Sequence, residues 1–396
     1  MRVKNFLTGS RAAYSFIAGA LVLLLLFAFL PGCAPEVVPP AEDAYEKYVA
    51  SLPEGCFPVP RECFEQALEE GQLNIYDWAE WWPEEIYTNF ENEFGIDIIR
   101  DNYASEMEVV AKFKLYPETP YDVITGIGIR TFYPLKESAV LQEINHEWIP
   151  NVNEYLPQSL KEASFDPDYH YGVSCERSLT AYGYNTAYVD DPRIPSWSVL
   201  FEPKEEYRGR ISLVEDMQEV VGAALKYLGY SWNSDNEAEL MEARDLLMQL
   251  KPYIGTFDSW PVRPILEEEI WIANNWYGDS LYLHRELSTI TGAVPAEGSR
   301  MGVDPLVIPI GSQHPAAAHL WINYLFRPRV HAALMEGICY LPSHTTAEQY
   351  LSSEAREWWE PVLSEEYQAK CEYDEPKALT GKGLELRSAI WEELKA

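Results

Sequence analysis

The sequence predicts an α/β fold in which strands and helices alternate, as they do in doubly wound sheets. Two observations support this prediction. A complete strand–helix–strand unit is readable at residues 73–103. Beyond it, short apolar runs recur with amphipathic, helix-length stretches between them, and no internal repeat is visible.

The unit at 73–103 is defined by both of its strands and by both ends of its helix. Residues 73–78 (LNIYDW) and 96–100 read as strands. Pro83 suits the first turn of the helix between them, and Gly95 suits its end. Apolar residues recur every fourth position and so share one helix face: Ile86, Phe90 and Phe94.

The later elements are predicted from the same patterns. Met107, Val110 and Phe113 stand at helical spacing. Further strands are expected at 121–125, 211–214, 270–274 and 303–308, and further helices at 135–141, 219–229, 238–250 and 316–326. Residues 151–171 are polar and interrupted by proline, so a surface excursion is expected there.

Length and charge narrow the function. The 396 residues suffice for about two or three domains. Acidic residues number 63 against 30 basic ones, which gives a formal net charge of −33. Such a field repels DNA and RNA, so nucleic-acid binding is not expected, whereas cationic partners are favoured. A salt-tolerant surface is the other explanation of the acid excess, and composition alone does not separate the two.

The N-terminus carries an export signal. Basic residues precede an apolar run at 16–30, and residues 30–33 read LPGC. This ending resembles the lipobox of secreted lipoproteins, with Cys33 as the acylated residue, so residues 1–33 are expected to be a lipoprotein signal peptide. The run is also long enough to approach an uncleaved membrane anchor. Both alternatives place the rest of the chain outside the cytoplasm, held at the membrane.

Residues 34–71 are expected to form a Pro-rich tether followed by a small helical prelude. Within it, Cys56 and Cys63 flank a short Pro-rich turn and are expected to form a disulfide in an oxidising compartment. Cys339 and Cys371 are a second possible pair, although sequence alone does not fix connectivity. Cys175 is expected to be a buried thiol.

A ligand site is expected at the carboxyl end of the first strand, where open α/β sheets bind ligands. Trp78, Glu80, Trp81 and Trp82 gather there. Indole faces attract a cation and a carboxylate supplies a charge-assisted hydrogen bond, so this chemistry suits a cationic organic ligand. The alternative is that the tryptophans are core residues under a loop.

The order of the motifs resembles that of the extracellular solute-binding proteins of ABC importers, specifically the spermidine/putrescine-binding group. The resemblance runs from residue 73 to the C-terminus. Its segments are YDWAE at 76–80, YDV at 121–123, EEYRG at 205–209, EDMQEVVGAALKYLGYS at 215–231, DPLVIP at 304–309 and HLWINYLFRPRV at 319–330. The runs ALKYLGYS and WINYLFRP are the most specific of them.

The resemblance implies a two-lobed periplasmic-binding-protein-like fold of type 2. Each lobe is a mixed sheet flanked by helices, and the ligand lies in the cleft between the lobes. Lobe 1 is expected at 72–182 and 305–345, and lobe 2 at 183–304 and 346–396. The resemblance also implies a monomeric binder, with no cofactor, metal or catalytic residue, which closes on a small solute and delivers it to an ABC permease.

By the same resemblance, aromatic rings hold the methylenes of a polyamine and acids hold its nitrogens. The aromatic positions are Trp78, Trp81, Trp276 and Tyr340, and the acidic positions are Glu80, Asp216, Glu219 and Asp304. Several have structural alternatives: a helix capping box for Asp216 and Glu219, core packing for Trp276, an ion pair with Arg300 for Asp304, and hinge packing for Tyr340.

The sequence departs from the family at several expected contacts. Ile127 and Ile129 stand where the family has serine and tyrosine, Gly302 where it has an aromatic, and SCER at 174–177 where the segment is commonly aromatic and neutral. Arg130 and Arg177 are both placed to approach the cleft, which would favour a ligand that carries a carboxylate. An amino-acid-like or sugar-like solute is therefore the alternative ligand for the same class of binder.

An enzyme is the remaining alternative. Asp216 and Glu219 would suit a glycosidase, in which two carboxylates flank the scissile bond. The sequence contains no GxSxG, HExxH or P-loop motif, and no GxGxxG after a strand. The scattered histidines, including His314 and His319, have poor metal spacing and are expected at the surface. These observations favour a binder over an enzyme.

Overall fold

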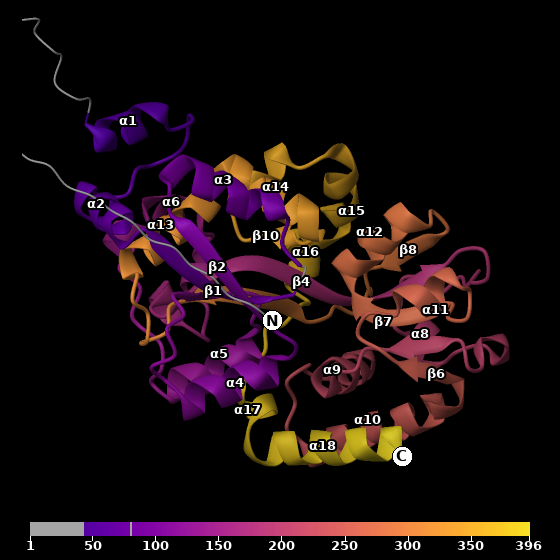
Figure 1. Cartoon of the computed structure of the whole chain (residues 1–396). Helices are drawn as coiled ribbons and strands as arrows, with labels where there is room; N and C mark the ends of the chain where they lie inside the picture. Colours follow the sequence, from indigo (N-terminus) through magenta and orange to yellow (C-terminus); the bar gives the residue numbers. More distant parts are fainter. Residues whose placement is uncertain (1–42, 80) are drawn as a thin grey trace, which may run out of the picture. The chain divides into compact units, whose positions relative to one another are not determined.

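The computed structural model describes residues 43–79 and 81–396 (Figure 1). Residues Ala44–Ala396 form one compact unit. The expected signal peptide at 1–33, with Cys33, and the loop residue Glu80 lie outside the described residues. Within the described ranges, no helix is long and apolar enough to cross a membrane.

The unit Ala44–Ala396 is built on a mixed sheet. Its strands lie in the order β2-β1-β3-β9-β4-β7-β5-β6, and β8 and β10 both pair with β4. The strands are β1 (Gln72–Trp78), β2 (Asp97–Tyr103), β3 (Val123–Ile124), β4 (Gly172–Asn185), β5 (Ile211–Leu213), β6 (Ile254–Phe257), β7 (Ile272–Trp276), β8 (Ile290–Ala293), β9 (Met301–Val307) and β10 (Leu341–Pro342). β1 runs parallel to β2 and β3, whereas β9 is antiparallel to both β3 and β4.

The long strand β4 joins the two halves of the sheet (Figure 1). Residues 172–179 of β4 pair with β9, and residues 180–185 pair with β7 and β8. One large hydrophobic core draws on residues 48–175 and 303–355, and a second draws mainly on residues 182–293 with the end of the last helix. The two-lobed α/β fold is confirmed, and β4 is the strand that crosses between the lobes.

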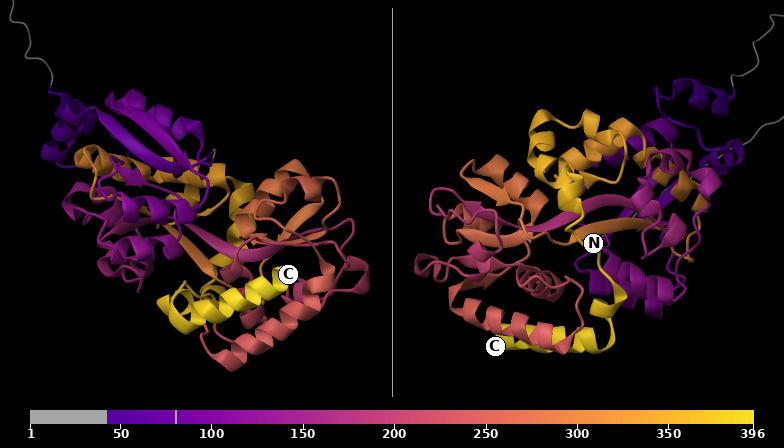
Figure 2. Two further views of the ribbon diagram at one scale, coloured as in Figure 1. Left: turned by 60° about the horizontal axis from the view of Figure 1, so that its bottom comes forward. Right: turned by 180° about the vertical axis from the view of Figure 1, so that it is seen from behind.

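Helices flank the sheet of each lobe. They are α1 (Ala44–Ser51), α2 (Arg61–Glu70), α3 (Glu84–Phe94), α4 (Glu106–Leu115), α5 (Ile129–Glu137), α6 (Pro150–Tyr155), α7 (Gln158–Lys161), α8 (Ser198–Phe201), α9 (Met217–Tyr227), α10 (Glu237–Leu250), α11 (Val262–Leu266), α12 (Tyr277–Glu286), α13 (Pro315–Leu325), α14 (Pro328–Ile338), α15 (Ser353–Leu363), α16 (Glu365–Gln368), α17 (Pro376–Leu379) and α18 (Gly381–Lys395). In the first lobe, α3 and α14 contact each other, as do α4 and α5. In the second lobe, α9, α10 and α18 pack together, and Figure 2 shows α18 alongside α10.

The helix α3 forms as its sequence predicts. Pro83 directly precedes it, and Gly95 ends it in the left-handed conformation with φ 67°, donating its N–H to the carbonyl of Glu91. The three residues predicted to share a face are all buried: Ile86, Phe90 and Phe94. This face packs into the first core, so α3 covers the strands on either side of it in the sequence.

The helix predicted from Met107, Val110 and Phe113 is α4, which buries Val109 and Phe113 against the first core and leaves Met107 81% exposed. One sequence prediction is wrong. The segment after residue 150 is not a surface excursion. It forms α6 and α7, and the buried side chain of Asn151 donates to the carbonyl of Asn323 at 2.8 Å, which ties the segment to α13.

The predicted bridge between Cys56 and Cys63 is also wrong, because both residues are free thiols. Cys63 lies within α2 and is buried in the first core, where its Sγ lies 3.7 Å from the carbonyl of Ala316. Cys56 instead lies in the neighbourhood of Arg327. The two sulfurs therefore face different surroundings, and α1 and α2 are held to the body by packing. Cys175 is a buried free thiol, as predicted.

Candidate functional site

Two carboxylates face each other where the crossing strands pair. Glu176 of β4 stands directly opposite Asp304 of β9 in the antiparallel register. Directly opposed side chains on a sheet lie about 5 Å apart at Cβ, and like charges in such positions destabilise it. Glu176 is only 1% exposed, and among the described residues neither of its carboxylate oxygens has a hydrogen-bond partner. An uncompensated acid pair in the core of the crossing requires a proton or an added cation.

A third carboxylate joins this pair from α4. Glu106 is the first residue of that helix, which Ser105 caps, and it accepts a hydrogen bond from the hydroxyl of Thr131. A Cβ placed on Gly128 would lie 3.6 Å from both the Oδ1 of Asp304 and the Oε1 of Glu106. The two carboxylates thus converge beside Gly128. We call Glu106, Glu176 and Asp304 the acidic triad.

The acidic triad is electrostatically strained. Burial, together with the repulsion of Glu106, raises the pKa of Asp304 to about 7. Burial and the facing Asp304 raise the pKa of Glu176 well above its ordinary value, and burial also raises the pKa of Glu106. Within the described part of the chain, no member of the triad forms an ion pair with a lysine, arginine or histidine. The site therefore favours a positive charge from outside.

Aromatic rings stand beside the acidic triad. Tyr103, at the end of β2, and Tyr340, just before β10, both have pKa values raised first by burial and then by nearby acids, among them Asp304 and Glu176. Trp81 meets Tyr340 edge to face, with ring centroids 5.9 Å apart. Rings and carboxylates together are the combination that holds an organic cation in a desolvated site.

Gly126 permits this aromatic arrangement. Its φ of +67° is left-handed, and a Cβ there would lie 2.7 Å from the ring of Trp81. The hydroxyl of Tyr103 donates to the carbonyl of Thr125 at 2.6 Å, which fixes that ring beside the same turn. The loop after β3 is therefore shaped by the two rings that it contacts.

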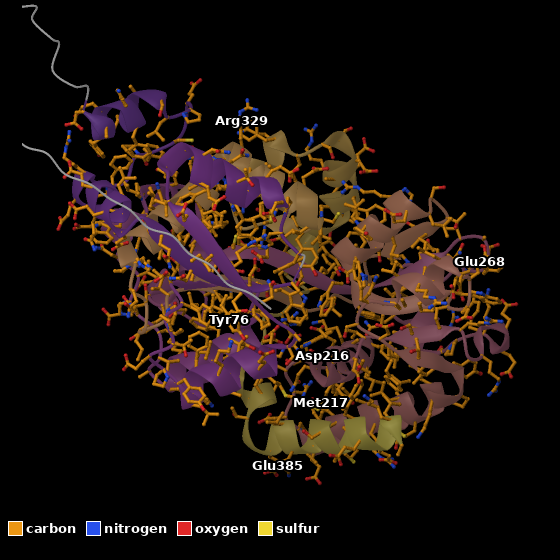
Figure 3. All side chains as sticks on the ribbon, viewed as in Figure 1. Tyr76, Asp216, Met217, Glu268, Arg329 and Glu385 are labelled. Atoms are coloured by element: carbon orange, nitrogen blue, oxygen red, sulfur yellow. The ribbon has the colours of Figure 1, made fainter. Side chains whose placement is uncertain are left out.

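The predicted acids at the start of α9 are already paired. Asp216 caps the helix by accepting from the N–H groups of Gln218 at 2.8 Å and Glu219 at 3.2 Å, as the capping alternative predicts. The guanidinium of Arg130, which comes from α5, also forms ion pairs with Asp216 and Glu219. Figure 3 labels Asp216 at this position. A contact from α5 to α9 links the two lobes directly.

A second arginine extends the same network. Arg300 lies 3.0 Å from Glu219 and 2.7 Å from Asp374, and Arg130 lies 3.4 Å from Asp374. Burial alone would raise the pKa of Asp374, but the two arginines lower it below its ordinary value. Arg300 thus pairs with these acids rather than with Asp304. We call Asp216, Glu219 and Asp374 the paired acids.

Arg300 also explains one departure from the family. A Cβ on Gly302 would lie 2.7 Å from Nη1 of Arg300 and 2.1 Å from Oγ of Ser178. The space beside residue 302 is therefore filled by a guanidinium and a hydroxyl. Arg177, which alternates with Glu176 along β4, turns elsewhere and donates to the carbonyl of Pro342 at 2.8 and 3.2 Å. Of the two arginines predicted to approach the cleft, Arg130 reaches the interlobe acids and Arg177 does not.

The remaining predicted contacts lie around this centre. Trp78 ends β1, is 37% exposed and meets Tyr103 edge to face at 5.1 Å. Trp276 ends β7 and packs against both cores. The prediction of a surface position for His319 is wrong, since that side chain is buried and Trp148 contacts its ring.

Sequence reasoning missed Glu106 and Tyr103. It named Arg300 only as a possible partner of Asp304, and Glu176 only as part of an unusual segment. Glu106 follows a helix cap and reads as ordinary helix-start chemistry. Within the described ranges, no group of three or more His, Cys, Asp or Glu residues is arranged to hold a metal ion.

Comparisons with known proteins agree with this fold. A family model described as bacterial extracellular solute-binding protein matches residues 85–364. The spermidine/putrescine-binding periplasmic protein of Salmonella typhimurium is 32% identical over 292 residues, which cover 73% of this chain and 82% of that protein. The putrescine/cadaverine-binding protein of Pseudomonas aeruginosa is 26% identical over 344 residues, which cover 83% of this chain and 95% of that protein.

Solved structures show the same fold. The spermidine/putrescine ABC transporter substrate-binding protein of Streptococcus pneumoniae superimposes with a TM-score of 0.74 at 24% identity, covering 82% of this chain and 98% of that one. A lipoprotein of Treponema pallidum superimposes with a TM-score of 0.70 at 24% identity, covering 82% and 99%. Sequence match and fold together show that this chain belongs to the bacterial extracellular solute-binding protein family.

Proposed function

We propose that this protein captures an aliphatic amine of the polyamine class between its lobes and delivers it to an ABC permease in the membrane. The observation that carries the proposal is the acidic triad beside Trp81, Tyr103 and Tyr340: the buried Glu176 and the half-buried Glu106 and Asp304 form no ion pair in the described structure. The amine nitrogen lies between Glu176 and Asp304, and the methylenes lie along the rings. The relatives whose names record putrescine or spermidine binding support the same ligand class.

The proposed contacts include the residues predicted from the sequence. We propose Trp81, Asp304 and Tyr340 as the central contacts of the ligand. Trp78, Trp276 and Glu80 are proposed as further contacts. Asp216 and Glu219 act through Arg130, which they hold. Glu106, Tyr103 and Glu176 are added to the set.

The arginines argue against a ligand that needs a carboxylate partner. Arg130 and Arg300 are both neutralised by the paired acids, so neither guanidinium is available to an incoming anion. An amino-acid-like ligand would bring its carboxylate toward the unpaired triad, where like charges repel it. The amine is therefore the better ligand.

Closure of the lobes supplies the signal to the permease. We propose that lobe 1 comprises 72–182 and 305–345 and lobe 2 comprises 183–304 and 346–396, with the crossing strand β4 as part of the hinge. A ligand that touches both lobes favours the closed form. We further propose that the protein acts as a monomer, held at the outer face of the membrane through a lipid on Cys33, and that it has no catalytic activity.

A thermal-shift experiment tests the proposal. The purified full chain, in mild detergent at pH 8, is heated with putrescine, spermidine, glycine or maltose. Putrescine at 100 times its Kd should stabilise the protein by about 2.7 kcal/mol, without chemical change to the amine, and glycine and maltose should not. Asp304→Asn should abolish the shift, and Asp97→Asn, at an exposed position on β2, should keep it. The absence of a shift with every amine would refute the ligand assignment.

A further inference from the structure

We infer that Arg130 is a built-in cation that occupies the acid pair at the start of α9, so that the cleft accepts the ammonium group of a short amine and discriminates against longer polyamines. The inference rests on the proposed function and specifies its ligand. It concerns a residue whose side chain belongs to one lobe and whose partners belong to the other.

Arg130 occupies the acids that the sequence analysis assigned to a ligand ammonium group. Nη1 pairs with Asp216, Nη2 pairs with Glu219, and Nε lies 3.4 Å from Asp374. Each of the three nitrogens of the planar guanidinium is directed at a carboxylate. These contacts fix the orientation of the group and also neutralise its charge. The side chain is 19% exposed, and Glu219 is fully buried, so the pair is shielded from solvent. The pKa of Arg130 is raised well above its ordinary value, since these acids outweigh the effect of burial.

The backbone of Arg130 lies in the first turn of α5, which has contacts of its own. Gly128 caps the amino end of α5, and the hydroxyl of Thr131 donates to Glu106 of the acidic triad. The first turn of α5 therefore carries both Thr131, which binds the acidic triad, and Arg130, which pairs with the acids of α9. Arg130 is directed at α9 by its backbone position.

The paired acids have no place left for a second ammonium group. Glu219 forms ion pairs with Arg130 and, at 3.0 Å, with Arg300, and it accepts a hydrogen bond from the hydroxyl of Thr180. Asp374 forms an ion pair with Arg300 at 2.7 Å. A ligand nitrogen would have to displace Arg130 and leave its charge half-buried without a partner. Removal of one partner of a buried ion pair is strongly destabilising. The loss of this ion pair disfavours ligands that carry a further cation. Such an unfavourable contact is a usual basis of discrimination between similar ligands.

The acidic triad, in contrast, lacks a cation. Its three members form no ion pair in the described structure, although Arg130 and Arg300 lie close enough to lower the pKa of Asp304 against the larger effect of burial. A single ammonium group between Glu176 and Asp304 relieves the repulsion of that pair. The matching ligand therefore has one nitrogen at the triad and a short aliphatic body along Trp81, Tyr103 and Tyr340.

The test compares three amines of increasing charge on the full chain at pH 8 by calorimetric titration: butylamine, putrescine and spermidine. The wild type should bind spermidine more weakly than putrescine. Arg130→Ser, which frees Asp216, should bind spermidine about tenfold tighter than the wild type, with little change for butylamine. Arg130→Gln keeps the length of the side chain and removes its charge, so it should show the same change if the serine variant is unstable.

The matched control is Arg244→Ser. Arg244 also binds two carboxylates, of Asp245 and Glu393, but it lies on the outer helix α10. Its removal should leave all three affinities unchanged. An Arg130 variant that folds, binds putrescine and keeps the wild-type order of affinities would overturn the inference and leave the proposed function intact. Failure of the wild type and all variants to bind any of the amines would overturn both.

Discussion

Replacement of Asp304 by asparagine should make the ligand-free protein more stable and at the same time prevent amine binding. Asp304 faces Glu176 across the crossing strands and converges with Glu106 beside Gly128. The ionised form is therefore disfavoured in the folded chain. Asparagine has nearly the same shape, carries no charge and can donate a hydrogen bond to the carboxylate of Glu176, whose oxygens have no partner among the described residues.

The size of the effect follows from the pKa of Asp304. Burial and Glu106 raise it from 3.8 to about 7. Because the folded state holds the proton more tightly than the unfolded state, stability is lost as the pH rises from about 4 to 7. At 1.36 kcal/mol per pKa unit the full loss above pH 7 is about 4 kcal/mol, and since Glu176 shares the proton we expect Asp304→Asn to recover about 2–4 kcal/mol at pH 8.

The assay is urea unfolding of the full chain at pH 8 and pH 5, with and without putrescine. The stability gain should be largest at pH 8 and smaller at pH 5, where the aspartate already holds its proton. Putrescine should stabilise the wild type and leave the variant unchanged. Asp97→Asn controls for the loss of one negative charge at an exposed position. A variant less stable than the wild type at pH 8 would show that Asp304 is not destabilised by its neighbours, and one that still responds to putrescine would show that Asp304 is not a ligand contact.

Three further outcomes follow from the same site and its surroundings. Putrescine affinity should rise about tenfold per pH unit between pH 5.5 and 7 and level off above pH 8, because binding needs the raised carboxylates in their ionised form; calorimetry that shows a flat profile would contradict this. Gly126→Ala should lower stability by about 1–3 kcal/mol and weaken amine binding, because φ is +67° and the new Cβ would lie 2.7 Å from the ring of Trp81; an unchanged melting curve would count against it. A reducing agent should leave the melting temperature unchanged, since Cys56 and Cys63 are free thiols; a drop of several degrees would indicate a bridge.

Much of the fold was predictable because it depends on local patterns. The period of Ile86, Phe90 and Phe94, with Pro83 before the helix and Gly95 after it, specifies α3 without any long-range information. The cap at Asp216 is equally local, since an acid in that position binds the N–H groups that follow it. Both features depend only on residues a few positions apart, which a single sequence displays.

The centre of the site was predicted only in part, because the pairing register of β4 and β9 determines which side chains meet there. Glu176 and Asp304 meet because β4 and β9 pair antiparallel with an irregularity after Ser174, and no local pattern reveals that irregularity. The same strand alternation sends Arg177 to the other face, although it is adjacent in sequence to Glu176. The role of Arg130 requires α5 and α9 to lie side by side, which depends on how the lobes meet.

The Cys56–Cys63 prediction was wrong for a related reason. Spacing along the chain suggested a small closed loop, but packing decided which way each sulfur points. Cys63 is buried in the first core as part of α2, near Ala316 of α13, and that contact is some 250 residues away in sequence.

The most direct measurement is a structure of the protein crystallised with putrescine at pH 8. We expect one ammonium nitrogen between Glu176 and Asp304, about 3 Å from a carboxylate oxygen of each, with Arg130 still paired to Asp216 and Glu219. An amine bound at another position, with the space between those two carboxylates unoccupied, would show that the acidic triad is not the amine site.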